Sequence, residues 1–162
     1  MKKKSNSFNF DLFRKTYKGP TIRVKLTSLM EDPAAYLPTT PFTSSAEVAE
    51  YFSPLEEEPR EVLLALHLNT KHRALSIEEV SKGTLSGCPF YNKEILQGAI
   101  LANAGALILI HNHPSGDPKP SPEDIKVTKI LKPLAELHNI RLLDHVIIGR
   151  RSHFSLADQG LL

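Results

Sequence analysis

The residues with the clearest chemical potential are two histidines that end an apolar run. The segment LILIHNHP places His111 and His113 one residue apart, and a loop rich in proline and glycine follows. Side chains two positions apart in a β-strand point to the same side of a sheet, so the two imidazoles would project together. Neutral imidazole is a common ligand of zinc and other divalent cations. The spacing therefore predicts a metal platform at the end of a strand.

A third ligand is predicted where the next helix starts. Residues 121–124, Ser-Pro-Glu-Asp, have the form of a capping box, which alone would explain Ser121 and Asp124 as residues that begin a helix. The proline-stiffened loop must nevertheless bring this helix start back toward the histidines. His111, His113 and Asp124 would then offer two nitrogens and one oxygen, a set that suits Zn2+ with one position left for water. The alternatives are a histidine pair that only forms hydrogen bonds and a degenerate site.

Glu61 is the candidate general base. It is the polar residue that leads directly into the apolar run VLLALHL. If that run forms a strand beside residues 106–111, the carboxylate can reach a water at the metal and relay its proton. The alternative is that Glu61 belongs to the solvated acidic run at residues 56–58.

These residues also match a known signature. Residues 111–124, HNHPSGDPKPSPED, resemble the JAMM motif, which is His-x-His, seven residues, Ser, two residues and Asp. The wider segment 83–149, together with LNTKHR and the ending SLADQGLL, resembles the RadC-like branch of that superfamily. The resemblance extends from about residue 45 to residue 162.

The resemblance implies a zinc hydrolase with an MPN-type (JAB) fold that is related to cytidine deaminases. In residues that match the family, His111, His113 and Asp124 would hold Zn2+, and Ser121 would steady the oxyanion of the tetrahedral intermediate. Glu61, by its position before an early strand, would be the general base. The function implied is a JAMM-type metallopeptidase that cuts a peptide or isopeptide bond in an unknown protein or peptide. The DNA-repair label that the family carries has no independent support in these residues.

The sequence departs from the family pattern in places. Many full-length RadC-like proteins carry a helix-hairpin-helix-type domain near the N-terminus, and residues 1–43 are too short and too proline-broken to form one. The usual Pro-Arg-Glu before the first long helix reads Asn-Lys-Glu at residues 92–94. Asp144 and His145 match the family pattern, and either could orient a metal ligand or form a buried structural pair.

The same residues bear on three functions other than hydrolysis. The letters His-Asn-His suggest a nuclease, but nuclease motifs of that name spread the three residues over a ββα unit. A nucleobase deaminase needs His-x-Glu and Pro-Cys-x-x-Cys, and Cys88 is the only cysteine. A non-catalytic interaction module with an MPN fold, or a DNA-associated protein, remains the alternative. The intact set of site residues argues against it.

The composition indicates the class of protein. With 162 residues, 41% of them hydrophobic and 23% charged, one soluble globular domain is expected. No apolar run approaches the ~18 residues of a membrane span, and the N-terminus lacks the apolar stretch of a secretory signal. A single cysteine excludes an internal disulfide, so a cytoplasmic location is expected.

Positive charge is concentrated near the N-terminus. Residues 1–25 carry eight Lys and Arg against Asp11 alone, whereas the remainder carries twelve basic and seventeen acidic residues. We expect a basic flexible arm and extended lead-in at residues 1–43 and the RadC-like domain at residues 44–162. Such an arm can make weak, salt-dependent contact with nucleic acid, or it can simply be solvated.

Apolar runs alternate with helical patterns along the rest of the chain. Continuous apolar strands separated by helices predict an α/β or α+β fold with a mixed central sheet covered on both faces. The predicted strands are 21–29, 61–69, 74–83, 106–111, 140–149 and 153–158. The predicted helices are 44–55, 92–105 and 121–139.

Two helices carry more detailed expectations. Asn92 is predicted to cap the helix at 92–105, with Gly105 just beyond its end. Pro133 is expected to kink or disturb the helix at 121–139. The inner side of that helix is predicted to hold Ile125, Val127, Ile130, Leu131, Leu134 and Leu137.

Overall fold

The computed structural model describes residues 37–83 and 91–162, so the basic arm, the strand predicted at 21–29 and Cys88 lie outside the described residues. Within those ranges, no helix has the length and apolar character needed to cross a bilayer. The elements are α2 (Ser45–Tyr51), the 3-10 helix η2 (Ser53–Glu57), β1 (Val62–Leu68), β2 (Ala74–Lys82), α3 (Asn92–Leu101), β3 (Ala106–Asn112), α4 (Pro122–Leu137), β4 (Arg141–Gly149) and β5 (Ser152–Ser155).

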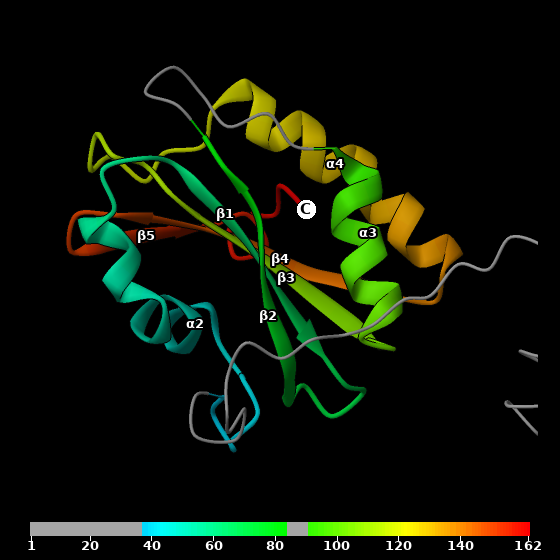
Figure 1. The fold of residues 1–162 in the computed structure, drawn as a ribbon. Helices are drawn as coiled ribbons and strands as arrows, with labels where there is room; N and C mark the ends of the chain where they lie inside the picture. Colours follow the sequence, from blue (N-terminus) through cyan, green and yellow to red (C-terminus); the bar gives the residue numbers. More distant parts are fainter. Residues whose placement is uncertain (1–36, 84–90) are drawn as a thin grey trace, which may run out of the picture.

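The five strands form one sheet in the order β2-β1-β3-β4-β5. β3 and β4 pair in parallel, and the other three pairings are antiparallel. Helices α3 and α4 cover one face of the sheet and α2 covers the other (Figure 1). This mixed, two-sided arrangement confirms the predicted fold class.

β3 is the central strand, and all seven of its residues are buried. Leu107 and Leu109 pack on the side of α3 and α4, whereas Ile108 and Ile110 pack on the side of α2. A strand that is covered on both faces has no solvent side, which explains its unbroken apolar sequence. The same alternation continues into the two histidines and therefore decides which face they use.

The buried face of α4 differs from the predicted one. Of the six aliphatic residues expected to face inward, only Leu131 is fully buried, while Ile130 is 44% exposed and Leu137 78% exposed. The prediction was right for Leu131 and Leu134, which belong to or pack against the core, and wrong for Ile130 and Leu137. Two polar residues occupy the inner face where the helix passes the histidines. The helix also continues past Pro133, which lies on its exposed side. The buried residues of α4 are Asp124, Thr128, Leu131 and Ala135.

The ends of α3 also differ from expectation. Its N-cap is Tyr91, and Asn92 is the first helical residue without a capping side-chain bond. The helix ends at Leu101, and Asn103 rather than Gly105 adopts the left-handed conformation after it, with φ of 51°. Asparagine tolerates this conformation, so the chain turns two residues earlier than the glycine suggested. The last strand is also shorter than predicted and occupies Ser152–Ser155.

His67 in β1 is buried away from the two site histidines. Its side chain is 2% exposed, its Nδ1 lies 2.8 Å from Ser76 Oγ, and its Nε2 lies 3.6 Å from Glu78. Glu78 in turn fills the space beside Gly98 of α3, where a Cβ would collide with the carboxylate. Burial lowers the pKa of His67 to about 4.

This burial predicts a loss of stability in acid. An unfolded histidine titrates near 6.5, so between pH 6.5 and pH 4 the unfolded chain binds a proton that the folded chain does not. The free energy of unfolding should therefore fall as the pH decreases, by about 2 kcal/mol from this group at pH 5. Urea unfolding at pH 7 and pH 5 should show a smaller loss in His67→Leu. The exposed-site control His153→Gln should keep the wild-type loss, and an equal loss in both variants would contradict the assignment.

Candidate metal centre

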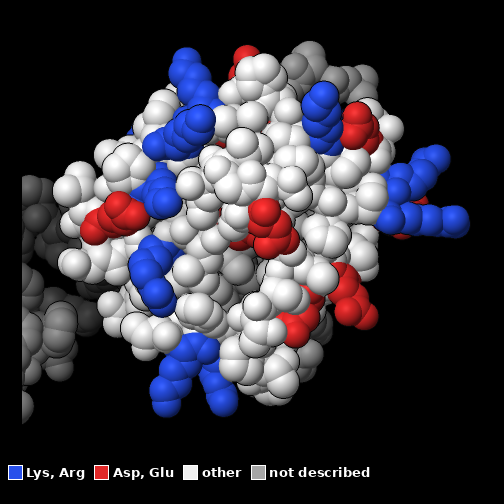
Figure 2. Space-filling model, turned by 180° about the vertical axis from the view of Figure 1, so that it is seen from behind, with Lys and Arg blue, Asp and Glu red and all other residues white. Residues whose placement is uncertain are grey.

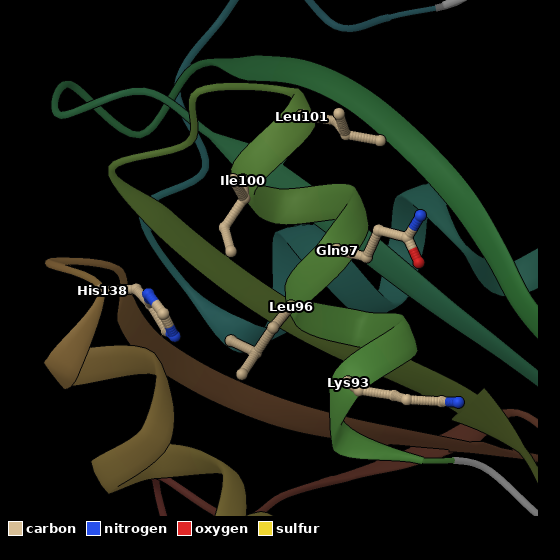
Figure 3. Close-up of a pocket in the computed structure, with 6 residues that line it drawn as sticks. All are labelled: Lys93, Leu96, Gln97, Ile100, Leu101 and His138. Carbon is tan, nitrogen blue, oxygen red and sulfur yellow. The ribbon is translucent and has the colours of Figure 1, made fainter. Parts of the chain in front are cut away.

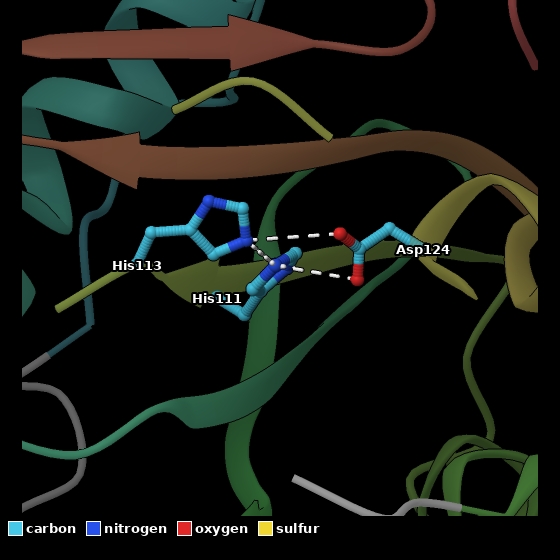
Figure 4. A group of neighbouring side chains, drawn as sticks. All are labelled: His111, His113 and Asp124. Carbon is cyan, nitrogen blue, oxygen red and sulfur yellow. Dashed lines mark hydrogen bonds and ion pairs between the residues drawn. The ribbon is translucent and has the colours of Figure 1, made fainter. Parts of the chain in front are cut away.

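The end of β3 and the first turn of α4 bring three candidate ligands together (Figure 4). Nε2 of His111 lies 3.0 Å from Nε2 of His113 and 3.5 Å from Oδ1 of Asp124. Nε2 of His113 lies 3.7 Å from Oδ2 of Asp124. His111 and Asp124 are buried, and His113 is partly exposed. The loop therefore returns the helix start to the histidines, as its length and prolines predicted.

The spacing of these atoms suits a metal ion. A zinc ion with tetrahedral geometry and Zn–N distances of about 2.0–2.1 Å separates two ligand atoms by about 3.3 Å. The three separations of 3.0, 3.5 and 3.7 Å lie close to that value. Two ring nitrogens 3.0 Å apart also need a proton or a cation between them, because facing lone pairs repel. The residues present therefore fit a divalent cation.

The electrostatics of His111 and Asp124 favour a bound cation, whereas a cation at His113 would have to displace a proton. Burial and the neighbouring His145 lower the pKa of His111 well below its ordinary value. The contact with Asp124 raises the pKa of His113. Burial alone would raise the pKa of Asp124, but the contact with His113, the neighbouring His111 and the hydrogen bonds from Ser121 lower it well below its usual range. An ionised carboxylate and a neutral buried imidazole are the forms in which these side chains bind metals.

Glu61 lies at the same site. The antiparallel β1–β3 register pairs Leu63 with His111. Continued by two residues beyond this pair, the same register would place Glu61 opposite His113. Burial and the charge of Asp124 raise the pKa of Glu61, and His113 partly offsets this. A half-buried carboxylate with a raised pKa is suited to moving protons near neutral pH.

The neighbouring residues Glu56 and Glu58 have partners outside the candidate metal centre. Oε2 of Glu56 accepts a hydrogen bond of 2.8 Å from the backbone of Arg151, and Glu58 forms an ion pair of 2.9 Å with Lys82. Glu61 is therefore distinct from the acidic run that precedes it.

Asn112, between the two histidines, holds the backbone around Glu61. It points to the opposite face of the sheet and is completely buried. Its Oδ1 accepts the N–H of Val62 at 2.8 Å, and its Nδ2 donates to the carbonyls of Arg60 at 3.1 Å and Glu58 at 3.2 Å. The residues on both sides of Glu61 are thus tied to β3. This role of Asn112 was not predicted from the sequence, although a polar residue inside a buried strand signals a specific partner.

Ser121 acts as the helix cap in the structure. Its Oγ accepts the N–H of Asp124 at 3.2 Å and donates to Oδ2 of Asp124 at 2.7 Å, while its N–H donates to the same oxygen at 2.7 Å. This complete capping box orients the Asp124 carboxylate toward the histidines. The predicted oxyanion role of Ser121 stays a prediction.

Asp144 and His145 take different roles. Nε2 of His145 lies 2.8 Å from Nδ1 of His111, and burial lowers the pKa of His145 to about 4. Asp144 accepts hydrogen bonds from the backbone of His145 and Ala157 and from the hydroxyl of Ser155. It therefore ties the segment after β5 to β4, whereas His145 contacts a candidate ligand. Asp144 therefore has a structural role, and the role of His145 in orienting a metal ligand stays a prediction.

A model of the RadC-like JAB domain matches residues 42–161. The chain belongs to the RadC-like JAB domain family. It is 46% identical over 120 residues to a UPF0758 protein of Histophilus somni, which covers 74% of this chain and 54% of that protein. It is 40% identical over 150 residues to a UPF0758 protein of Methylibium petroleiphilum, which covers 89% of this chain and 68% of that protein. The chain spans about half the length of several curated relatives that it matches.

The RadC-like domain also has an apolar pocket that is separate from the histidine–aspartate cluster (Figure 3). Its volume is about 370 Å³, and five of its lining residues lie on α3. The sixth, His138, follows the C-terminus of α4, whereas Asp124 lies in the first turn. None of the lining residues belongs to the candidate metal centre, so the pocket and the metal centre are distinct sites.

The charge of the domain is mixed. The described residues carry twelve Lys and Arg against fifteen Asp and Glu. On the face seen in Figure 2, basic and acidic side chains are interspersed rather than gathered into one broad patch. The described residues on that face do not form the continuous basic surface with which proteins commonly track a phosphate backbone.

The role of Asn112 predicts a specific loss of stability. Asn112→Ala would leave the Val62 N–H and two backbone carbonyls without their partner, at a cost of about 3 kcal/mol in the free energy of unfolding. Asn92→Ala is the matched control, because Oδ1 of Asn92 has no hydrogen-bond partner among the described residues. Urea denaturation should show a cost below about 1 kcal/mol for that variant. Equal costs for the two variants would refute the proposed clamp.

Proposed function

We propose that this RadC-like JAB domain is a zinc-dependent hydrolase that cleaves a peptide or isopeptide bond. The observation that carries the proposal is the convergence of His111, His113 and Asp124 with the carboxylate of Glu61 beside them. Three side chains suited to zinc, with a proton-accepting group next to them, are the minimum that metal-assisted hydrolysis requires.

The residues divide the chemistry between them. Zinc, when bound, supplies Lewis acidity, which activates water near neutral pH and polarises a substrate carbonyl. Glu61 takes the proton of the attacking water on a carboxylate oxygen and returns it to the nitrogen of the leaving amine. Its raised pKa helps the first transfer, because a more basic carboxylate accepts the proton of the water more readily. Asn112 keeps the Glu61 backbone in register with the histidines.

The proposal retains Ser121 as a donor to the substrate oxyanion. Its hydroxyl donates to Asp124 in the structure, so this role requires the hydroxyl to rotate toward the substrate. The Ser121 N–H still donates to Asp124 after that rotation, so the metal ligand remains oriented. A binding module without catalysis is the alternative, and nothing about the geometry favours it over hydrolysis. Nucleic-acid contact through the basic arm stays a prediction, because the arm lies outside the described residues.

Metal content tests the first half of the proposal. Protein purified without a histidine tag should contain close to one zinc per chain by elemental analysis. His113→Ala should reduce this content several-fold, because it removes one of three ligands. His153→Ala is the matched control, since it removes an exposed histidine that is not part of the cluster and should leave the content unchanged. A wild-type protein that takes up no zinc after reconstitution would rule out the hydrolase and leave a binding scaffold.

Glu61→Gln tests the second half. The variant should keep its zinc but lose activity by about 100-fold or more in kcat, because an amide cannot accept the proton. The measurement is a screen of peptide and isopeptide-linked substrates, with Glu58→Gln as the control, since Glu58 pairs with Lys82. Wild-type activity that survives in Glu61→Gln would show that another group is the base.

A further inference from the structure

A chain of hydrogen bonds links two of the candidate ligands, Asp124 and His111, through the buried side chains of Thr128 and His145. Oγ1 of Thr128 contacts the carbonyl oxygen of Asp124 at 2.7 Å and Nδ1 of His145 at 2.7 Å. Nε2 of His145 then contacts Nδ1 of His111 at 2.8 Å. Thr128 and His145 are both completely buried, so neither can exchange these partners for water. We call this chain, from the Asp124 carbonyl to His111, the hydrogen-bond relay.

With His145 neutral, the direction of every hydrogen bond in the relay follows from the carbonyl oxygen of Asp124. A carbonyl oxygen can only accept, so the single hydroxyl hydrogen of Thr128 must donate to Asp124. Thr128 can then only accept from His145, which must carry its proton on Nδ1. A neutral His145 with Nδ1–H has a lone pair on Nε2, and this lone pair accepts Nδ1–H of His111. The Nε2 of His111, which faces Asp124 and His113, is thereby left without a proton.

We propose that Thr128 and His145 are positioning residues that hold His111 in the one tautomer able to bind a divalent cation through Nε2. The inference rests on the metal site of the proposed function. A neutral imidazole can carry its proton on either nitrogen, and the hydrogen bond at the far nitrogen decides which one is free for a metal. Without the relay, His111 could place an N–H in the site and oppose a cation there.

The other histidine reaches the same tautomer by a different route. Nδ1 of His113 lies 2.7 Å from the carbonyl oxygen of Asp117, which can only accept. Its proton is therefore on Nδ1, and in the neutral ring Nε2 is free. Two independent arrangements, a loop carbonyl and a buried relay, thus leave the same ring nitrogen available on both ligands. This agreement argues against Thr128 and His145 as merely satisfied core residues.

A simpler role for Thr128 must still be separated from this one. Threonine in a helix often donates to the carbonyl four residues earlier, and that bond needs no histidine. Thr128→Ser keeps the hydroxyl, whereas Thr128→Val keeps the shape and removes it. A structural role would change the thermal stability of both variants without changing their metal affinity. The relay predicts that affinity depends on the hydroxyl.

The first experiment is a competition titration of zinc against a chromophoric chelator. Thr128→Val should lower zinc affinity by about 10–100-fold, as loss of partners behind metal ligands typically does. Thr128→Ser should stay within about threefold of wild type. Should Thr128→Val not fold, the pair His145→Gln and His145→Leu takes its place, because only glutamine offers an acceptor to His111. Equal affinities within either pair would overturn the proposal.

The second experiment reads the tautomers in the metal-free protein. Long-range ¹H–¹⁵N spectra of the histidine rings should show the proton of His145 on Nδ1 in wild type and Thr128→Ser, and a changed ring signal in Thr128→Val. The same spectra should place a proton on Nδ1 of His111. A wild-type His111 with its proton on Nε2 alone would overturn the relay. If wild type binds no zinc, the proposed function fails. The spectra of the metal-free protein still show whether His111 carries its proton on Nδ1, as the relay requires, or on Nε2.

Discussion

Complete burial of β3 is the constraint on which the rest of the structure depends. Both faces of this strand are covered, so each of its residues must suit one of two different layers. A shift of one residue in its register would exchange the two faces. His111 would then face α2, and Asn112 would face Asp124. The packing of four aliphatic side chains therefore sets the position of the chemistry at the end of the strand.

The candidate metal centre contains buried polar side chains, and their burial would destabilise the fold if they lacked hydrogen-bond partners. Unpaired polar atoms in an interior destabilise a fold by several kcal/mol, so buried polar residues need complete partners. Asn112 and His145 bond through both polar atoms of the side chain, and the single hydroxyl of Thr128 forms two hydrogen bonds. The inner face of α4 begins with Asp124 and Thr128 for the same reason, since these residues complete bonds that a leucine could not.

The pKa values of two neighbouring carboxylates, Asp124 and Glu61, are shifted in opposite directions. Asp124 receives hydrogen bonds from Ser121 and lies beside two imidazoles, which keeps it ionised. Glu61 is half-buried, feels the charge of Asp124 and has a raised pKa. Such a divergence of environments separates a metal ligand from a proton carrier within one site. The proposed roles of Asp124 as a metal ligand and Glu61 as a proton carrier rest on hydrogen bonding and burial rather than on residue type, because both groups are carboxylates.

By itself, the sequence determined the order of most elements, the mixed sheet and the meeting of His111, His113 and Asp124. These features follow from local spacing, because strand alternation, apolar periodicity and a capping box are properties of neighbouring residues. Only the tertiary structure decided that Asn112 clamps the backbone of Glu61 and that His145 rather than Asp144 contacts a candidate metal ligand. It also decided that α4 buries Thr128 instead of Ile130 and Leu137. Each of these three features depends on a contact between residues that are far apart along the chain. Such partners cannot be recognised from the spacing of neighbouring residues in the sequence. A polar side chain is therefore placed by the partner that satisfies it, and that partner is defined only when the fold is complete.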